Sequence, residues 1–194
     1  MKEMNRREFL TLSGAAVVAL SLAGCGGGTY APPAPPAAPT GKEAELLAAI
    51  NKIWKEKFDA NEVDHEQLSF NQDAVGVIKG YGRVFEKANE TPHKLTTSDY
   101  AIVLEESVGL EEEILKKYGE GSLAGVAGVS EPSSENVVTL ECVYSCEGAA
   151  VRAFVDKLLN SNSNSSKAVY ISFYFPVVQN KTYMTAIAFL NNKP

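Results

Sequence analysis

The sequence predicts an α+β protein in which helices pack on an antiparallel sheet. Segments with helical periodicity come first along the chain, and segments with strand composition come last. One further helical segment lies between the strands, and the chain contains no internal repeat. This order of elements is typical of a single domain in which helices cover one sheet.

Two segments near the start of this domain have the spacing of amphipathic helices. The first follows Thr40–Glu43, a capping-box pattern, and carries its apolar residues on one face: Leu46, Leu47, Ile50, Ile53, Trp54 and Phe58. The second begins after Asn71, which we expect to cap it, and contains Gly76, Gly80 and Gly82. A glycine costs an exposed helix up to about 1 kcal/mol relative to alanine. We therefore expect these glycines at close contacts with a neighbouring segment.

Further along the chain, helical and strand patterns alternate with loops. Leu110–Gly119 predicts a short helix that ends at its glycine, and residues 119–134, rich in Gly and Ser, predict a loop. Residues 136–144 have strand composition. Val151–Leu158 then returns to helical spacing and is followed by a polar loop.

The last part of the domain predicts two strands joined as a hairpin. The β-rich runs are residues 168–178 and 183–190, and Gln179–Thr182 between them has turn composition. Pro176 has no N–H to donate to a sheet, so we expect it near the end or the edge of a strand.

The first 24 residues have the features of an export signal. Asn5–Leu10 has the twin-arginine form, with paired arginines, one spacer residue and Phe-Leu. The apolar run from Leu10 to Ala23 is 14 residues long, shorter than the roughly 20 that a membrane-spanning helix needs. A basic start, a short apolar centre and small residues describe a secretion signal. Twin-arginine signals direct folded proteins, so we expect the domain to fold before export.

The end of this signal, Leu22–Cys25, resembles a bacterial lipobox. In such signals the cysteine thiol receives a diacylglyceryl group, and Cys25 would become the mature N-terminus. Two acyl chains anchor a protein stably where one does not, at about 0.8 kcal/mol per buried CH₂. The alternative is an ordinary cleaved signal that contains a cysteine by chance. We expect an exported protein, lipid-anchored to the bacterial cell membrane, with its domain outside the cytoplasm.

A spacer separates this anchor from the domain. Residues 25–41 comprise Cys25 and a Gly/Pro/Ala-rich stretch that holds five of the chain's nine prolines. Such a composition is extended, at about 3.1 Å per residue. Residues 42–194 remain, and their 153 residues are enough for one domain with its own core.

The charge of the mature chain excludes some classes of partner. Residues 1–24 contain three basic and two acidic side chains, which leaves 15 basic and 22 acidic side chains and a net charge of −7. Nucleic acids and anionic membrane surfaces require clustered Lys and Arg, so we expect neither as a partner. The membrane contact is expected through the lipid alone. No nucleotide-binding loop, haem motif or cluster spacing is present, so no cofactor is expected.

Several motifs of the domain resemble those of the CAP superfamily, which includes cysteine-rich secretory proteins, venom allergens and plant pathogenesis-related proteins. Glu45–Asn51 reads ELLAAIN, like the ELLxxIN helix of bacterial members, and Leu68–Asn71 leads into the second helix as the family's L-x-W/F-(D/N) step does. Ser134–Val137 resembles the Gly-Glu-Asn-Ile/Leu motif with Ser for Gly. The resemblance covers most of residues 42–190. It implies a three-layer α-β-α sandwich with a central antiparallel sheet.

The resemblance also implies a cleft. In the family, two His and two Glu converge there and can hold a divalent metal. His93 matches the first histidine and Glu135 the glutamate of the Glu-Asn motif, so these two are the candidate cleft residues. The loop expected to carry the second histidine has none, and His65 lies elsewhere. The second glutamate would fall near Asp156 or Lys157, where the match is poor. We expect no tight zinc site. The alternatives are a surface histidine and a solvated carboxylate.

Cys142 and Cys146 are the two thiols that remain beside Cys25. In an exported protein such a pair first suggests a disulfide. A straight strand would hold their Cα atoms beyond the limit of about 7 Å, so this disulfide requires a turn between them. Two partly buried thiols, and a redox or metal role, are the other interpretations.

These features predict a cell-envelope lipoprotein that displays a non-catalytic CAP-like binding or interaction domain for an extracellular or envelope ligand. The alternative is a CAP-type hydrolase, such as a peptidase, with a cleft site at His93 and Glu135. A redox lipoprotein built on Cys142 and Cys146 is a third hypothesis. The sequence does not place a base, a nucleophile and an orienting group together. We therefore assign no catalytic residue and favour the binding domain.

Overall fold

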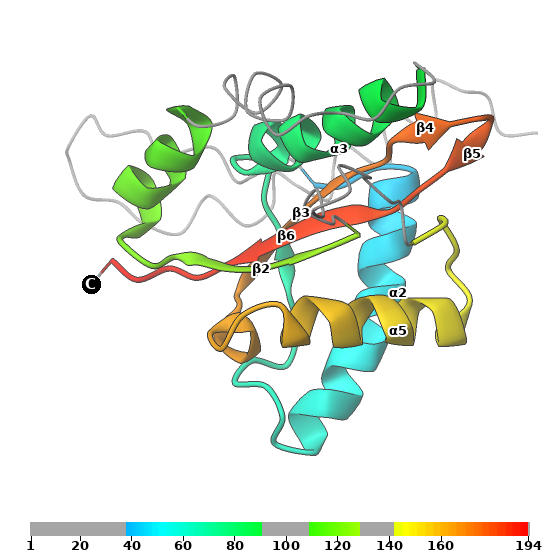
Figure 1. The fold of residues 1–194 in the computed structure, drawn as a ribbon. Helices are drawn as coiled ribbons and strands as arrows, with labels where there is room; N and C mark the ends of the chain where they lie inside the picture. Colours follow the sequence, from blue (N-terminus) through cyan, green and yellow to red (C-terminus); the bar gives the residue numbers. More distant parts are fainter. Residues whose placement is uncertain (1–37, 91–108, 129–141, 194) are drawn as a thin grey trace, which may run out of the picture. The chain divides into compact units, whose positions relative to one another are not determined.

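The computed structural model describes residues 38–90, 109–128 and 142–193 (Figure 1). The described residues all belong to one unit, Pro36–Pro194. The elements of this unit, in chain order, are α2 Lys42–Asp59, β1 Ser69–Phe70, α3 Val75–Glu90, a helical segment over residues 109–118, β2 Leu123–Ala127, α5 Gly148–Asn160, the 3₁₀ helix η1 Ser165–Lys167, β3 Tyr170–Tyr174, β4 Val177–Val178, β5 Lys181–Thr182 and β6 Thr185–Phe189.

The main sheet has four strands in the order β1-β3-β6-β2. The predicted antiparallel arrangement is correct for β3, β6 and β2. It is wrong for β1, which runs parallel to β3 with Ser69 opposite Tyr170, so the sheet is mixed. Strand β1 does not join β3 through a hairpin. Its connection to β3 runs through helices and β2, and a parallel pair requires a long connection of this kind.

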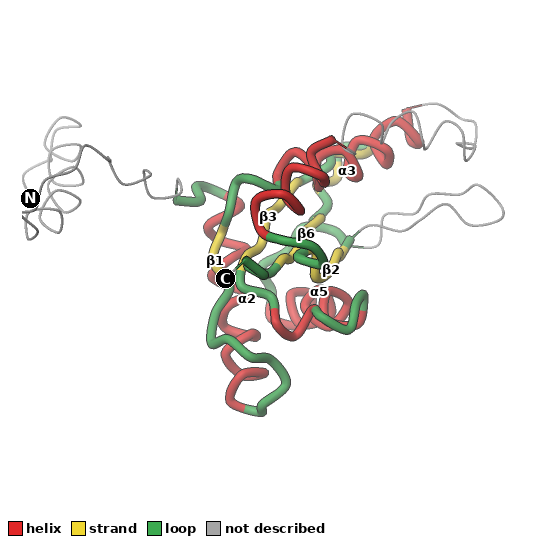
Figure 2. The backbone as a smooth tube through the Cα atoms, turned by 90° about the vertical axis from the view of Figure 1, so that its left-hand side faces the viewer, coloured by secondary structure: helices red, strands yellow, loops and turns green. Residues whose placement is uncertain are grey.

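Helices pack against both faces of this sheet. Side chains alternate between the two faces of a strand, and β6 is buried along its whole length. Its Ala186 and Ala188 belong to a core cluster with α2 and α5, whereas Ile187 and Phe189 belong to a second cluster with α3 and residues 109–118. Figures 1 and 2 show α3 and α5 on opposite sides of β6. The protein is therefore of the α+β class, with a core on each face of the sheet.

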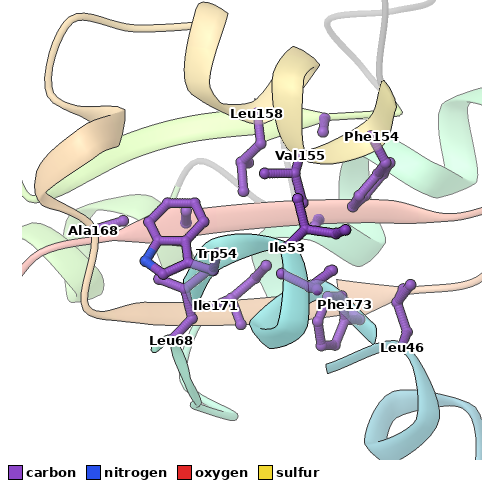
Figure 3. Packing of buried hydrophobic residues seen from close by; sticks show 14 of the residues in the cluster. Leu46, Ile53, Trp54, Leu68, Phe154, Val155, Leu158, Ala168, Ile171 and Phe173 are labelled. Atoms are coloured by element: carbon purple, nitrogen blue, oxygen red, sulfur yellow. The ribbon is translucent and has the colours of Figure 1, made fainter. Parts of the chain in front are cut away.

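The larger core cluster contains the side chains that the helical patterns predicted. Leu46, Ile53 and Trp54 of α2 meet Phe154 and Leu158 of α5 over the sheet (Figure 3). Trp54, Phe154 and Leu158 are completely buried. The helical spacing of both segments therefore predicted the buried faces correctly.

The predicted caps of the first two helices are wrong. Gly41 is the N-cap of α2, with a φ of 55°, and no side chain caps this helix. Thr40 contributes its backbone carbonyl, which accepts the Glu43 N–H at 3.2 Å. Asn71 precedes α3 by four residues, and its Oδ1 accepts the Asp73 N–H at 2.9 Å. Thr40 therefore serves the first turn of α2 through its backbone carbonyl, whereas Asn71 stabilises the turn before α3.

The Gly- and Ser-rich stretch predicted as a loop contains the edge strand β2. Gly125 in this strand lies against α5, and a Cβ there would meet the Leu158 carbonyl oxygen at 2.7 Å and the Ser165 Oγ at 2.5 Å. The β2–β6 register shifts between Leu123 and Gly125. Small residues weaken a strand's intrinsic propensity, so pairing with β6 and the close approach of α5 decide this strand.

The predictions for Gly76, Gly82, Gly119 and the hairpin are confirmed. A Cβ at Gly76 would meet Leu110 Cδ1 at 2.6 Å, and one at Gly82 would collide with the Tyr174 ring. The helical segment 109–118 ends at Gly119, which has a φ of 98°. The hairpin is also present, although its turn is shorter than predicted. Only Gln179 and Asn180 lie between β4 and β5, and both have a positive φ.

Candidate functional site

The candidate cleft residues His93 and Glu135 lie outside the described residues, as does Cys25. Their roles stay predictions. His65, the other histidine, has an exposed side chain in the loop after α2, and its backbone carbonyl accepts the Trp54 indole N–H at 2.9 Å. This histidine therefore takes part in the fold through its backbone.

Within residues 38–90, 109–128 and 142–193, no group of three or more His, Cys, Asp and Glu side chains is placed to hold a metal ion. Over those same ranges, no helix has the length and apolar character to cross a membrane.

A polar pocket of about 250 Å³ lies at the C-terminal ends of α2 and α5. Its lining includes Lys57, whose Nζ pairs with Asp156 at 2.8 Å and Glu62 at 3.0 Å. The Lys57 side chain is only 13% exposed. The remaining lining residues are Leu159, Asn160, Asn162, Ser163 and Ser166. These residues come from the end of α5 and the polar loop after it, where the family resemblance expects a second histidine that the sequence lacks.

The chemistry of this pocket suits binding of a polar group. The hydrogen bond to Asp156, and to a smaller extent the one to Glu62, raises the pKa of Lys57 above its ordinary value. Its ammonium therefore stays charged and is no base or nucleophile near neutral pH. One ammonium, two carboxylates, two amides and two hydroxyls supply hydrogen-bond donors and acceptors without an excess of positive charge. A signal for this site existed in the sequence only as a cluster of Asn and Ser after a helix.

The two cysteines of the domain are present as thiols rather than as a disulfide, so their pairing stays a prediction. Cys142 is half-buried and Cys146 is exposed. The Cys146 thiol lies 3.5 Å from the Tyr144 hydroxyl, which in turn donates to Glu45 Oε2 at 2.8 Å. Burial raises the pKa of Tyr144 well above its ordinary value, and the hydrogen bonds with Cys146 and Glu45 add to this effect. The sequence placed the two thiols near each other but did not reveal Tyr144 or Glu45.

A second polar cluster joins the start of α3 to the end of the helical segment 109–118. The Asn71 amide donates to the Tyr118 hydroxyl at 2.7 Å, and that hydroxyl donates to Asp73 at 2.5 Å. Lys117 pairs with the same Asp73 oxygen at 2.5 Å. The Tyr118 ring packs against Tyr170 and Phe189 of the sheet. The polar groups of this cluster bind one another and its ring packs on the sheet, so we interpret the cluster as structural.

Comparisons of the chain with protein-family models, with curated proteins and with solved structures found no match. The resemblance to the CAP superfamily therefore stays a prediction based on the motifs of the sequence.

Proposed function

We propose that this chain is a lipoprotein of the bacterial cell envelope that displays a non-catalytic, CAP-like binding or interaction domain. The observation that carries the proposal is the order of three features: the twin-arginine signal, the lipobox at Cys25 and the proline-rich spacer. A compact unit that begins at Pro36, within the spacer, supports the assignment of everything beyond it to one displayed domain.

The CAP-like part of the proposal concerns the fold. We propose a three-layer α-β-α sandwich for the domain. Its support is the pair of core clusters, one with Trp54 and Phe154 and the other with Ile78 and Ile114, that share the strand β6 between them. The mixed sheet, with β1 parallel to β3, departs from the antiparallel sheet that the resemblance implies.

The polar pocket around Lys57 supports binding as the function of the domain. Its ammonium is held by two carboxylates, and its rim offers amide and hydroxyl groups. Such a surface can hold a polar group of a ligand without any chemical step. The hydrolase with His93 and Glu135 in a cleft remains the competing proposal.

The lipid anchor is tested by metabolic labelling with a clickable palmitate analogue in a bacterial host that has twin-arginine export. The full chain should be labelled, Cys25→Ala should not, and the matched control Cys146→Ala should be labelled like the parent. An unlabelled parent chain, or label that persists in Cys25→Ala, would refute the anchor.

The choice between binding domain and hydrolase is tested by calorimetric titration with Zn²⁺. The full chain with Cys25→Ser is titrated beside the same chain with His93→Ala, and both are incubated with a peptide library. The binding proposal expects no zinc affinity that depends on His93 and no cleavage. Micromolar or tighter zinc binding that is lost in His93→Ala, together with His93-dependent cleavage, would establish the hydrolase instead.

A further inference from the structure

Cys142 lies on an extended segment that pairs with the chain before β6, and Cys146 follows this segment. The Met184 N–H donates to the Cys142 carbonyl, and the Tyr144 N–H donates to the Thr182 carbonyl, both at 2.8 Å. In such a ladder, side chains two residues apart point to the same face. Cys142 and Tyr144 therefore share a face, and both pack against the larger core cluster.

Tyr144 attaches this segment to the first turn of α2. Its hydroxyl donates to Glu45, and its ring lies under the Lys42 ammonium, 5.3 Å from the ring centre. The same ammonium donates to Thr182 Oγ1 at 3.3 Å. The ring also meets Phe175 edge-on, with centroids 5.5 Å apart. We refer to the contacts of Tyr144 with Glu45 and Lys42 as the Tyr144 clamp.

Cys146 is coupled directly to this clamp. Its thiol is the donor in the 3.5 Å contact with the Tyr144 hydroxyl, so one hydroxyl serves both Glu45 and Cys146. The chain bends between Tyr144 and α5, where the Glu147 N–H donates to Ser145 Oγ at 3.1 Å. Cys146 thus follows the extended segment, with its thiol in contact with the Tyr144 hydroxyl.

We propose that Cys142 and Cys146 form a reversible redox pair, and that a disulfide between them opens the Tyr144 clamp. The oxidant is an external disulfide that reacts by thiol–disulfide exchange. This inference goes beyond the proposed function and does not depend on the lipid anchor or on a ligand.

The exchange has two steps. The thiolate of Cys146, the exposed thiol, attacks one sulfur of the external disulfide, forms a mixed disulfide and displaces one thiolate. The thiolate of Cys142 then attacks the Cys146 sulfur, forms the internal disulfide and displaces the second thiolate. Two thiol protons of the protein end on the two released thiols, and two electrons pass from the protein to the oxidant.

Oxidation acts on the clamp for two reasons. A disulfide sulfur has no proton, so Cys146 loses the hydrogen bond that it donates to Tyr144. The disulfide also requires its two Cα atoms to lie within about 7 Å of each other, whereas residues 142–144 alone span about 6.6 Å when extended. Closing the ring therefore folds Tyr144 and Ser145 back and draws the Tyr144 side chain away from Glu45.

The test uses the full chain with Cys25→Ser, so that only the pair can react. The protein is equilibrated with oxidised or reduced glutathione, alkylated and weighed, and its amide hydrogen exchange is followed. We expect two alkylated thiols in the reduced protein and none in the oxidised one. Amides of Val143–Glu147 and of the first turn of α2 should exchange on the order of tenfold faster after oxidation, because a hydrogen bond to a charged group is lost.

Two variants test whether the faster amide exchange depends on the disulfide and on the Tyr144 clamp. Cys146→Ser keeps a donor for Tyr144, and its exchange should be the same in both buffers. Tyr144→Phe keeps both thiols and the ring but removes the hydrogen bond to Glu45, so its amides should already exchange quickly when reduced. Two alkylated thiols in the oxidising buffer would overturn the proposal, as would equal exchange in the oxidised and reduced forms of the parent chain.

Discussion

The indole N–H of Trp54 donates a hydrogen bond to the backbone carbonyl oxygen of His65 at 2.9 Å. Trp54 is completely buried in the larger core cluster, while the His65 side chain is exposed. The bond therefore attaches the loop after α2 to the core of the domain. The imidazole of His65 takes no part in it.

This bond predicts opposite results at its two ends. Trp54→Phe keeps an aromatic ring but leaves the carbonyl of His65 without its donor, which should lower the free energy of unfolding by about 1–3 kcal/mol. His65→Ala keeps the backbone carbonyl and should change it by less than about 0.5 kcal/mol. Urea denaturation of both variants measures this. Equal losses in the two variants would show that the imidazole matters after all.

Two buried serines should respond oppositely to the same substitution. Ser122 Oγ is buried without a hydrogen-bond partner, whereas Ser165 Oγ donates to the Ala124 carbonyl at 2.6 Å. A buried polar group without a partner costs about 1–3 kcal/mol. Ser122→Ala should therefore leave the melting temperature unchanged or raise it, and Ser165→Ala should lower it. A lower melting temperature in Ser122→Ala would indicate a partner such as an ordered water.

Gly82 of α3 should not tolerate a side chain. A Cβ there would collide with the Tyr174 ring, and this ring is held in place because its hydroxyl lies 3.1 Å from both carboxylate oxygens of Glu86. Gly82→Ala should destabilise the domain by about 1–3 kcal/mol, in spite of alanine's higher helix propensity. The control is Gly148→Ala at the start of α5, where a Cβ meets nothing within 4 Å. Thermal unfolding compares the two, and a neutral Gly82→Ala would contradict the close contact.

Asp73 should make stability depend on acid pH. Burial by itself raises its pKa, but hydrogen bonds from Lys117 and Tyr118, with the charge of Lys117, outweigh burial and hold the pKa below its usual value. A carboxyl group with a lowered pKa stabilises the fold above its unfolded pKa of about 3.9, and this contribution disappears as the pH falls through the folded pKa.

Asp73→Asn tests this dependence directly. The variant should be less stable than the parent chain near neutral pH, and the difference should narrow as the pH is lowered from about 7 to about 3. Urea denaturation across that range provides the measurement. A difference that stays constant with pH would mean that the carboxylate charge does not contribute.

The amino-acid sequence predicts some residues of the candidate sites and gives no indication of others. The pair Cys142 and Cys146 was evident from spacing alone. The contact of Tyr144 with Glu45 joins residues 99 positions apart, and no local pattern indicates such a pair. The pocket around Lys57 likewise forms because the ends of two helices meet, and its Asn and Ser residues carry no periodic signal.

Helical spacing alone predicts the helices and their buried faces, because it places Leu46, Trp54, Phe154 and Leu158 on apolar stripes that are excluded from water. The tertiary structure decided β2, the parallel pairing of β1 and the starts of α2 and α3. Strand β2 contains small residues with little intrinsic preference, so it exists as a strand because β6 pairs with it and Gly125 lets α5 approach. The spacing of apolar residues predicts which side chains are buried. Strand pairing and helix caps depend instead on backbone groups that only the folded chain brings together.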